Sequence, residues 1–169
     1  GIIKTLRSGS KPRIVEFGAR TGALAEVWRD LFDVEPICVE IDPSLIQILQ
    51  SKGFMTAPNI QSIASSIPFV YTANVLEHIE DDIEALKIIR EKLEPGGKIA
   101  IYVPAMPILF SDLDRSVGHF RRYKKKELVQ KVTNAGYEVQ SCYFNDSVGV
   151  LASLALKVLG YKGKIGLGS

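Results

Sequence analysis

The chain has 169 residues, of which 46% are hydrophobic and 24% charged, and its formal net charge is +2. This length suits one domain with a substantial core, and the composition excludes intrinsic disorder. The near-neutral charge gives no electrostatic reason to expect a nucleic-acid partner. Cys38 and Cys142 lie in apolar runs without the spacing of a metal or disulfide site, so we expect buried free thiols in a reducing, cytoplasmic setting.

Neither end of the sequence has the pattern of a targeting or membrane-spanning segment. Residues 1–11 lack an apolar stretch followed by a cleavage-like site. The longest apolar run near the end, 148–160, is interrupted by Ser153 and Lys157 and is shorter than the ~20 residues of a transmembrane helix. We expect a core helix there, and a weak contact with a membrane surface is the alternative.

The first part of the chain alternates strand-like and helix-like patterns. Residues 13–17 form a β-branched run typical of a buried parallel strand, and Thr21 is placed to cap the following helix. A second strand is predicted over 36–40, and Pro43 suits the first turn of the next helix.

The rest of the chain continues this alternation, although residues 53–68 lack a firm period and their predicted strand, around 60–63, is the least defined. In chain order, the later predicted elements are a strand over 69–73, a helix over 83–93, a strand over 98–103, a loop-rich stretch over 104–123, a helix over 124–135 and a strand over 137–144. Strands that alternate with helices predict an α/β fold with a doubly wound, mostly parallel sheet. Such sheets bind ligands at the carboxyl ends of their strands.

The first predicted strand ends in a glycine-containing turn, Glu16-Phe17-Gly18-Ala19-Arg20-Thr21-Gly22. Glycine lets the backbone approach a ligand closely, and the N–H groups that open the next helix favour polar or anionic groups. Such turns also occur for purely structural reasons. Glu40, however, ends the second strand about 20 residues further on, where a carboxylate holds the ribose diol in Rossmann-type sites. The two features together favour a nucleotide-type cofactor over a solvated surface acid.

Four segments in order over residues 13–103 resemble the motifs of class I S-adenosylmethionine-dependent methyltransferases. They are the glycine turn, Val39-Glu40-Ile41-Asp42-Pro43-Ser44, Asn74-Val75-Leu76-Glu77-His78-Ile79 and Leu93-Glu94-Pro95-Gly96-Gly97-Lys98. A later segment, Gly118-His119-Phe120-Arg121-Arg122-Tyr123, resembles a small-molecule subgroup, the type 11/12 domains. The resemblance implies a Rossmann-like, seven-stranded-type sheet whose last strand is lacking or truncated here.

The resemblance also implies one methyltransferase domain over 1–169. Its predicted parts are a lead-in (1–11), a cofactor-binding core (13–103), an acceptor-side loop (104–123) and a C-terminal helix, strand and apolar helix (124–169). The implied cofactor is S-adenosylmethionine, with S-adenosylhomocysteine as product. The implied cofactor-binding residues are Glu16, Gly18, Ala19, Arg20, Gly22, Glu40, Ile41 and Asn74.

The sequence departs from the family pattern at two places. Arg20 replaces the middle glycine of the turn, where its guanidinium could pair with the cofactor carboxylate or obstruct the cofactor. The segment 53–68 is short, which leaves only Asn59, Gln61 or Ser62 to contact the adenine.

The methyl acceptor is predicted to contact the loop 104–123, which leaves the sheet at its ligand-binding edge. Its apolar first half and basic second half suit a small-molecule or lipid-like acceptor with an anionic group. The candidate catalytic residues are His119, Tyr123 and His78, and no metal site is predicted. A hydrogen bond across the loop is the structural alternative for His78. The basic run 121–126 is either a solvated face or an anion-recruiting rim.

Two other function classes stay open at this point. One is a cofactor-binding module without catalysis, which turnover on an acceptor would separate from an enzyme. The other is a nicotinamide-dependent oxidoreductase, which is disfavoured because the glycine spacing lacks the third position of Gly-x-Gly-x-x-Gly.

Overall fold

The computed structural model describes residues 13–64 and 66–144. The chain divides into two compact units, Gly1–Val75 with Leu86–Tyr102 (the first unit) and Leu76–Ala85 with Val103–Ser169 (the second unit). The lead-in 1–11 and the apolar run 148–160, for which we predicted a core helix, lie outside the described residues. Among the described residues, no helix has the length and apolar character needed to cross a membrane.

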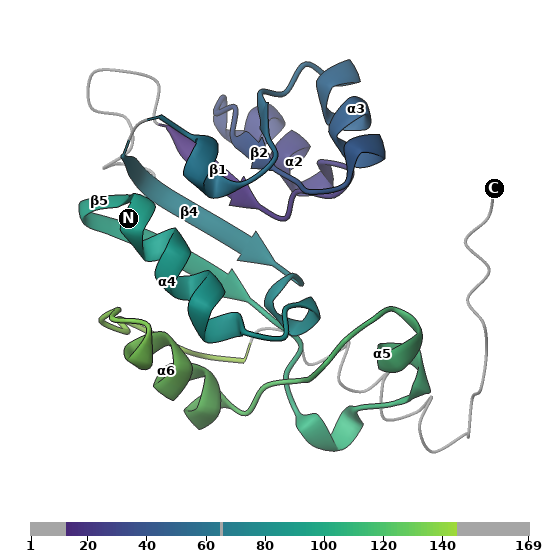
Figure 1. The fold of residues 1–169 in the computed structure, drawn as a ribbon, viewed down its shortest axis with the longest axis vertical. Helices are drawn as coiled ribbons and strands as arrows, with labels where there is room; N and C mark the ends of the chain where they lie inside the picture. Colours follow the sequence, from purple (N-terminus) through teal and green to yellow (C-terminus); the bar gives the residue numbers. More distant parts are fainter. Residues whose placement is uncertain (1–12, 65, 145–169) are drawn as a thin grey trace. The chain divides into compact units, whose positions relative to one another are not determined.

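The first unit is built on a five-stranded parallel sheet with the order β3-β2-β1-β4-β5. Its strands are β1 (Ile14–Phe17), β2 (Ile37–Val39), β3 (Thr56–Ala57), β4 (Ile67–Ala73) and β5 (Leu93–Tyr102). Figure 1 shows β1, β4 and β5 pointing the same way. The prediction of an α/β fold with a parallel, shortened sheet is confirmed.

Three helices follow strands of this sheet along the chain, because parallel neighbours need crossover connections. They are α2 (Ala23–Phe32), α3 (Pro43–Ser51) and α4 (Asp82–Lys92). The helix α3 begins as predicted, with Pro43 in its first turn, and the Asp42 side chain caps it by accepting from the Ser44 backbone N–H at 2.8 Å. The predicted cap Thr21 is wrong, because α2 begins one residue later, after Gly22, without a side-chain cap.

The central strands of the sheet are buried on both faces, as consecutive residues of β1 show. Val15 belongs to one apolar cluster with Val70 and Ile89, whereas Ile14 belongs to another with Phe69, against which Trp28 and Phe32 pack. Since successive side chains of a strand point to opposite faces, both faces carry core. This double burial explains why the central strands have continuous apolar runs rather than alternating patterns.

Two predicted strands are wrong. The third strand is Thr56–Ala57, while Ile60–Ser62 forms a 3₁₀ turn in which the Asn59 side chain accepts from the Ser62 N–H at 2.8 Å. That local bond competes with sheet pairing. Residues 137–144 form no strand in the part of the chain that the structure describes, because an apolar run becomes a strand only where it finds a partner edge.

The second unit contains short helical elements, including two within the stretch 104–123, where the sequence predicted a loop. They are the 3₁₀ turns η2 (Leu76–His78) and η3 (Pro107–Leu109), and the helices α5 (Asp112–Ser116) and α6 (Lys125–Asn134). The helix α6 confirms the predicted helix over 124–135. The prediction of buried free thiols is confirmed for Cys38 but not for Cys142, which is only half-buried.

Candidate functional site

The glycine turn of the first unit is held in a left-handed backbone conformation. The φ angles of Gly18, Arg20 and Gly22 are 80°, 50° and 80°. A Cβ atom at Gly18 would lie 2.4 Å from a methyl of Val75, and one at Gly22 would lie 2.7 Å from a methyl of Leu49. Packing against Val75 therefore favours glycine at position 18, and the left-handed backbone conformation favours it at both positions.

Glu40 connects the end of β2 to this turn through backbone hydrogen bonds. Its Oε2 accepts from the N–H of Arg20 at 2.8 Å, and its Oε1 accepts from Ile41 at 2.8 Å and Asp42 at 3.1 Å. Because these donors belong to the backbone, the carboxylate is held in one place without any basic side chain. The turn is fixed further by the N–H of Gly18, which donates to the carbonyl of Val39 at 2.9 Å.

Glu16 lies beneath the turn in β1 and is 4% exposed. The Tyr71 hydroxyl donates to its Oε2 at 2.9 Å. Burial raises the pKa of Glu16 to about 7, although the bond from Tyr71 partly opposes this shift. The pKa of the neighbouring Cys38 thiol is also raised, to about 12, by burial and by the charge of Glu16. Glu16 thus changes its charge near neutral pH.

Asn74 follows β4, and its φ is 53°. Its backbone N–H donates to the carbonyl of Tyr102 at the end of β5, and its side chain is exposed. The ends of β1, β2 and β4 lead into Gly18, Glu40 and Asn74 respectively. Because these strands are parallel, the three residues share the carboxyl edge of the sheet, where open α/β sheets bind ligands.

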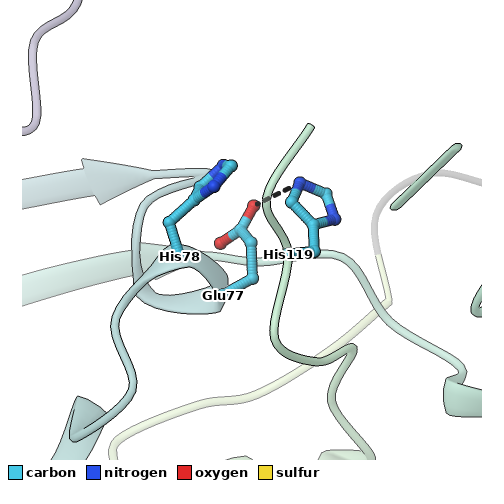
Figure 2. Close-up of side chains that lie close together, drawn as sticks. All are labelled: Glu77, His78 and His119. Atoms are coloured by element: carbon cyan, nitrogen blue, oxygen red, sulfur yellow. Dashed lines mark ion pairs between the residues drawn. The ribbon is translucent and has the colours of Figure 1, made fainter. Parts of the chain in front are cut away.

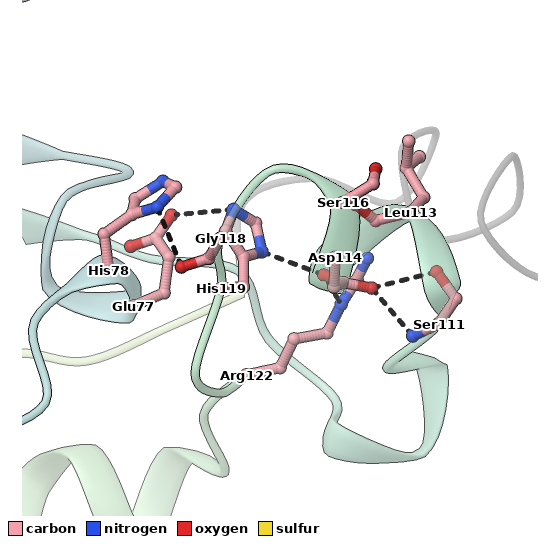
Figure 3. A network of polar contacts seen from close by, with 9 residues as sticks. All are labelled: Glu77, His78, Ser111, Leu113, Asp114, Ser116, Gly118, His119 and Arg122. Carbon is pink, nitrogen blue, oxygen red and sulfur yellow. Dashed lines mark hydrogen bonds and ion pairs between the residues drawn. The ribbon is translucent and has the colours of Figure 1, made fainter. Parts of the chain in front are cut away.

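Asp114 is a carboxylate of the second unit with several hydrogen-bond donors, and its side chain is 1% exposed. Its Oδ1 accepts from His119 Nδ1 at 2.9 Å and Arg122 Nε at 2.7 Å, and its Oδ2 accepts from the backbone N–H and hydroxyl of Ser111 at 2.9 and 3.0 Å (Figure 3). Burial alone would raise the pKa of Asp114, but these bonds outweigh it and lower the pKa. Asp114 therefore stays ionised inside the unit.

Glu77 differs from Asp114 although it is just as deeply buried, at 0% exposure. Neither of its carboxylate oxygens has a hydrogen-bond partner among the described residues. The imidazole of His119 lies beside it, with Nε2 3.9 Å from Glu77 Oε1 (Figure 2). Burial raises the pKa of Glu77 to about 7, with a smaller opposing effect from its own backbone and from Arg122.

The two histidines lie beside Glu77, with ring centroids 4.6 Å apart in an edge-to-face arrangement. His78 Nδ1 lies 3.2 Å from the Gly118 carbonyl, which is the cross-loop contact that the sequence suggested for this residue. The backbone N–H of Phe120 donates to the Glu77 carbonyl at 2.8 Å. The Gly118–Tyr123 segment is therefore tied to η2 on both sides of His119.

Asp82, at the start of α4, collects a second set of polar contacts. It accepts from the Tyr123 hydroxyl at 2.8 Å and from Lys131 at 2.8 Å, and Arg121 lies 2.9 Å away. Burial would raise the pKa of Asp82, but the three donors outweigh it and lower the pKa. Tyr123 is 2% exposed, and burial together with the bond to Asp82 raises the pKa of its hydroxyl.

The family comparison agrees with the fold and with the motifs. A family model with the description "Methyltransferase domain" matches residues 2–142. The chain belongs to this family. No curated protein matches the chain. Solved structures of methyltransferases do match it, at identities that establish the fold alone.

Three solved structures illustrate the similarity of this methyltransferase domain. A chain from the complex between the Haloferax volcanii Trm112 methyltransferase activator and a methyltransferase has a TM-score of 0.67 at 14% identity, over 82% of this chain and 67% of its own. A SAM-dependent methyltransferase from Archaeoglobus fulgidus has a TM-score of 0.63 at 16% identity, over 95% and 86%. The glycopeptide N-methyltransferase MtfA, solved with S-adenosyl-L-methionine, has a TM-score of 0.63 at 15% identity, over 83% and 82%.

The cofactor of this methyltransferase domain is S-adenosylmethionine, as for the class I fold that it shares. The residues at the carboxyl edge fit that molecule. A carboxylate can accept about four hydrogen bonds. The Glu40 carboxylate accepts three from backbone N–H groups, which leaves one lone pair for a hydroxyl of the ligand. Ile41, next to it, is 83% exposed and offers an uncovered apolar surface.

The predicted site residues of the methyltransferase domain fall into two groups. The cofactor candidates, all in the first unit, are Glu16, Gly18, Ala19, Arg20, Gly22, Glu40, Ile41 and Asn74. Of the catalytic candidates in the second unit, His78 and His119 lie together, whereas the Tyr123 hydroxyl is engaged by Asp82. These roles stay predictions.

The basic run 121–126 was predicted to be either a solvated face or an anion-recruiting rim. Neither prediction holds for its first two residues. Arg121 and Arg122 pair with the buried Asp82 and Asp114, so they are neither a solvated face nor a rim for anions. Only Lys124, Lys125 and Lys126 are exposed. The sequence reading also missed the acids Glu77, Asp82 and Asp114. Glu77 lay inside a recognised motif, but nothing local signalled the two aspartates.

Proposed function

We propose that this methyltransferase domain transfers the methyl group of S-adenosylmethionine to a small-molecule or lipid-like acceptor, with the cofactor held at the glycine turn of the first unit. The observation that carries the proposal is the Glu40 carboxylate, which three backbone N–H groups hold at 2.8–3.1 Å. A preorganised carboxylate pays little ordering entropy when it accepts a ribose hydroxyl.

Each residue of the turn has a part in this proposal. Glu16, Gly18, Ala19 and Gly22 shape the surface under the methionine part, Glu40 accepts from the ribose, Ile41 packs on the adenine and Asn74 lies beside the cofactor. Arg20 has an exposed side chain, so its guanidinium is available to the cofactor carboxylate. Its left-handed backbone lets the N–H reach Glu40, which is how the turn accommodates a residue other than glycine.

The cofactor supplies an electrophilic methyl group on a sulfonium that is already a good leaving group. The protein therefore needs chiefly to hold an acceptor in line, and it needs a base only when the acceptor arrives protonated. This requirement is compatible with a chain that has no catalytic triad in its recognised motifs.

The acceptor side of the proposal is the segment 104–123. Its exposed apolar side chains, Ile108, Val117 and Phe120, support an acceptor with an apolar body. Since Arg121 and Arg122 are paired internally, recognition of an anionic group falls to Lys124–Lys126 rather than to the arginines. We propose that His78 and His119 contact the acceptor and that Tyr123 is a positioning residue.

Calorimetry with S-adenosylmethionine, S-adenosylhomocysteine and NAD tests the cofactor proposal. The first two should bind and NAD should not. Glu40→Ala should weaken binding by about 1–3 kcal/mol, because a ribose hydroxyl loses its charged acceptor. Glu35→Ala, at an exposed position in the same region, is the matched control. Thermal unfolding of each variant without ligand separates lost binding from lost fold.

Turnover is measured separately, as S-adenosylhomocysteine released with a panel of apolar and lipid-like acceptors. Single alanine substitutions of His78 and His119 should reduce turnover while cofactor affinity is kept. Cofactor binding without turnover on any acceptor would favour the non-catalytic module. Tight NAD binding without S-adenosylmethionine binding would overturn the proposal.

A further inference from the structure

The buried Glu77 carboxylate has an unmet requirement for positive charge. It is 0% exposed, and neither oxygen has a hydrogen-bond partner among the described residues. A buried ionised carboxylate is costly unless it is paired or coordinates a metal. The guanidinium of Arg122 lies nearby, but it donates to Asp114, so its charge is already paired with that carboxylate.

The two imidazoles beside Glu77 are oriented by contacts at their Nδ1 atoms. His119 Nδ1 lies 2.9 Å from Asp114 Oδ1, and His78 Nδ1 lies 3.2 Å from the Gly118 carbonyl (Figure 3). Metal-binding histidines commonly donate one ring N–H to a carboxylate or a backbone carbonyl, which fixes the tautomer and makes the other nitrogen a better ligand. Both kinds of orienting partner occur here, one on each ring.

We infer that Glu77, His78 and His119 form a binding site for a divalent transition-metal ion. One ligand atom from each residue lies within 4.8 Å of the other two, and all three residues belong to the second unit. Figure 2 shows the three side chains directed toward one another. The site revises the sequence-based expectation of no metal, and it does not depend on the proposed methyl acceptor.

The donor set indicates the class of ion. Two imidazoles and one carboxylate suit Zn²⁺, Fe²⁺, Mn²⁺ or Co²⁺, whereas Mg²⁺ and Ca²⁺ prefer oxygen ligands. Three protein ligands also leave at least one coordination position for a water or another molecule. Ligands about 2.0–2.1 Å from Zn²⁺ in a tetrahedron lie about 3.3 Å apart, so binding would draw the three side chains together from their present spacing.

The metal site also changes what His119 would do in the proposed function. As a ligand, its Nε2 would hold the ion rather than take a proton from an acceptor. Asp114 would then act as the positioning residue of the site, because it orients the His119 ring and is fully engaged by other donors.

The test is calorimetric titration of the purified chain with Zn²⁺, after treatment with a chelator and its removal, and with Mg²⁺ in parallel. The wild type should bind one Zn²⁺ and unfold at a higher temperature with it. Glu77→Gln and His78→Ala should each weaken Zn²⁺ binding by more than the roughly 10–100-fold that loss of an outer partner costs. Asp114→Asn should fall within that smaller range. His119→Ala should behave like the other two ligand variants.

Two controls separate this site from adventitious binding. Glu80→Gln removes an exposed carboxylate from the same segment, and Cys142→Ser removes the half-buried thiol. Both should bind Zn²⁺ as the wild type does. The chain has only two histidines, so no other imidazole can substitute.

The inference is overturned if the wild type shows no saturable Zn²⁺ binding, if Glu77→Gln binds normally, if Mg²⁺ binds as tightly as Zn²⁺, or if Cys142→Ser abolishes binding. Unfolding curves without metal show whether each variant is folded. If His119→Ala does not fold, Glu77→Gln still decides the question, because it keeps the side-chain volume.

Discussion

The glycine turn of the first unit and the Gly118–Tyr123 segment of the second unit are both rich in polar groups, but they use them in opposite ways. In the turn, backbone N–H groups hold Glu40, so the side chains of Arg20 and Ile41 stay exposed. In the segment, side chains bond to side chains, and Arg121, Arg122 and Tyr123 are engaged by buried aspartates. A polar motif can thus present its side chains to a ligand, or it can use them in hydrogen bonds and ion pairs that stabilise its own fold.

The comparison predicts its largest effect at Asp82. Asp82→Ala should lower the free energy of unfolding by about 4 kcal/mol, because removing one partner of a buried ion pair leaves the other charges uncompensated. Denaturation in urea measures this. Asp112→Ala, which breaks an exposed pair with Arg115, is the matched control and should cost at most about 0.5 kcal/mol. Equal losses in the two variants would mean that the segment does not depend on its internal pairing.

A second effect concerns the acid beneath the turn. The folded-state pKa of Glu16 is about 7, against an ordinary value of 4.5. The folded state therefore binds this proton more tightly than the unfolded state does, so the contribution of Glu16 to stability is most favourable below pH 4.5 and is lost as the pH rises to 7. Between these limits Glu16 should cost about 3 kcal/mol.

The variant Glu16→Gln should remove that cost, because it carries no charge and can still accept from Tyr71. Unfolding free energies of wild type and variant, measured from pH 4.5 to 7, should diverge as the pH rises. Parallel profiles would show that Glu16 titrates normally in the folded protein.

The close packing of the turn predicts a smaller effect. Gly18→Ala should destabilise by about 2 kcal/mol, since its Cβ meets Val75 and its φ is left-handed. Gly53→Ala is the matched control, because its φ of 85° is similar but no atom lies within 4 Å of its Cβ. The difference between the two variants, measured by thermal unfolding, isolates the packing contribution. No difference would mean that Val75 moves aside freely.

Fold and site were predictable from the sequence to different depths. The strands β1, β2 and β4 and the helices α3 and α6 follow from local apolar patterns, as does the family resemblance. The predictions of a strand at 137–144 and of a third strand around 60–63 were wrong, because strand pairing depends on partners that are distant in the sequence. Arg121 and Arg122 were misread for the same reason, since their partners Asp82 and Asp114 share no local period with them.

The smallest effect sharpens the comparison at Arg20. Arg20→Gly should stabilise the fold by about 0.5 kcal/mol, because relief of the left-handed strain slightly exceeds the entropy that glycine loses on folding. Affinity for S-adenosylmethionine should change less than tenfold, which is about 1.4 kcal/mol. A gain of tenfold or more would identify Arg20 as an obstruction to the cofactor.

The pairing of the only two histidines has a practical consequence for spectroscopy. Every imidazole resonance of this chain comes from one place, where the two rings stand edge to face at 4.6 Å. Each ring lies in the other's aromatic field, so a small rotation of either one shifts the signals of both. The imidazole C–H signals in a proton NMR spectrum of the unmodified protein therefore report on the state of this cluster alone, and they come from only two rings.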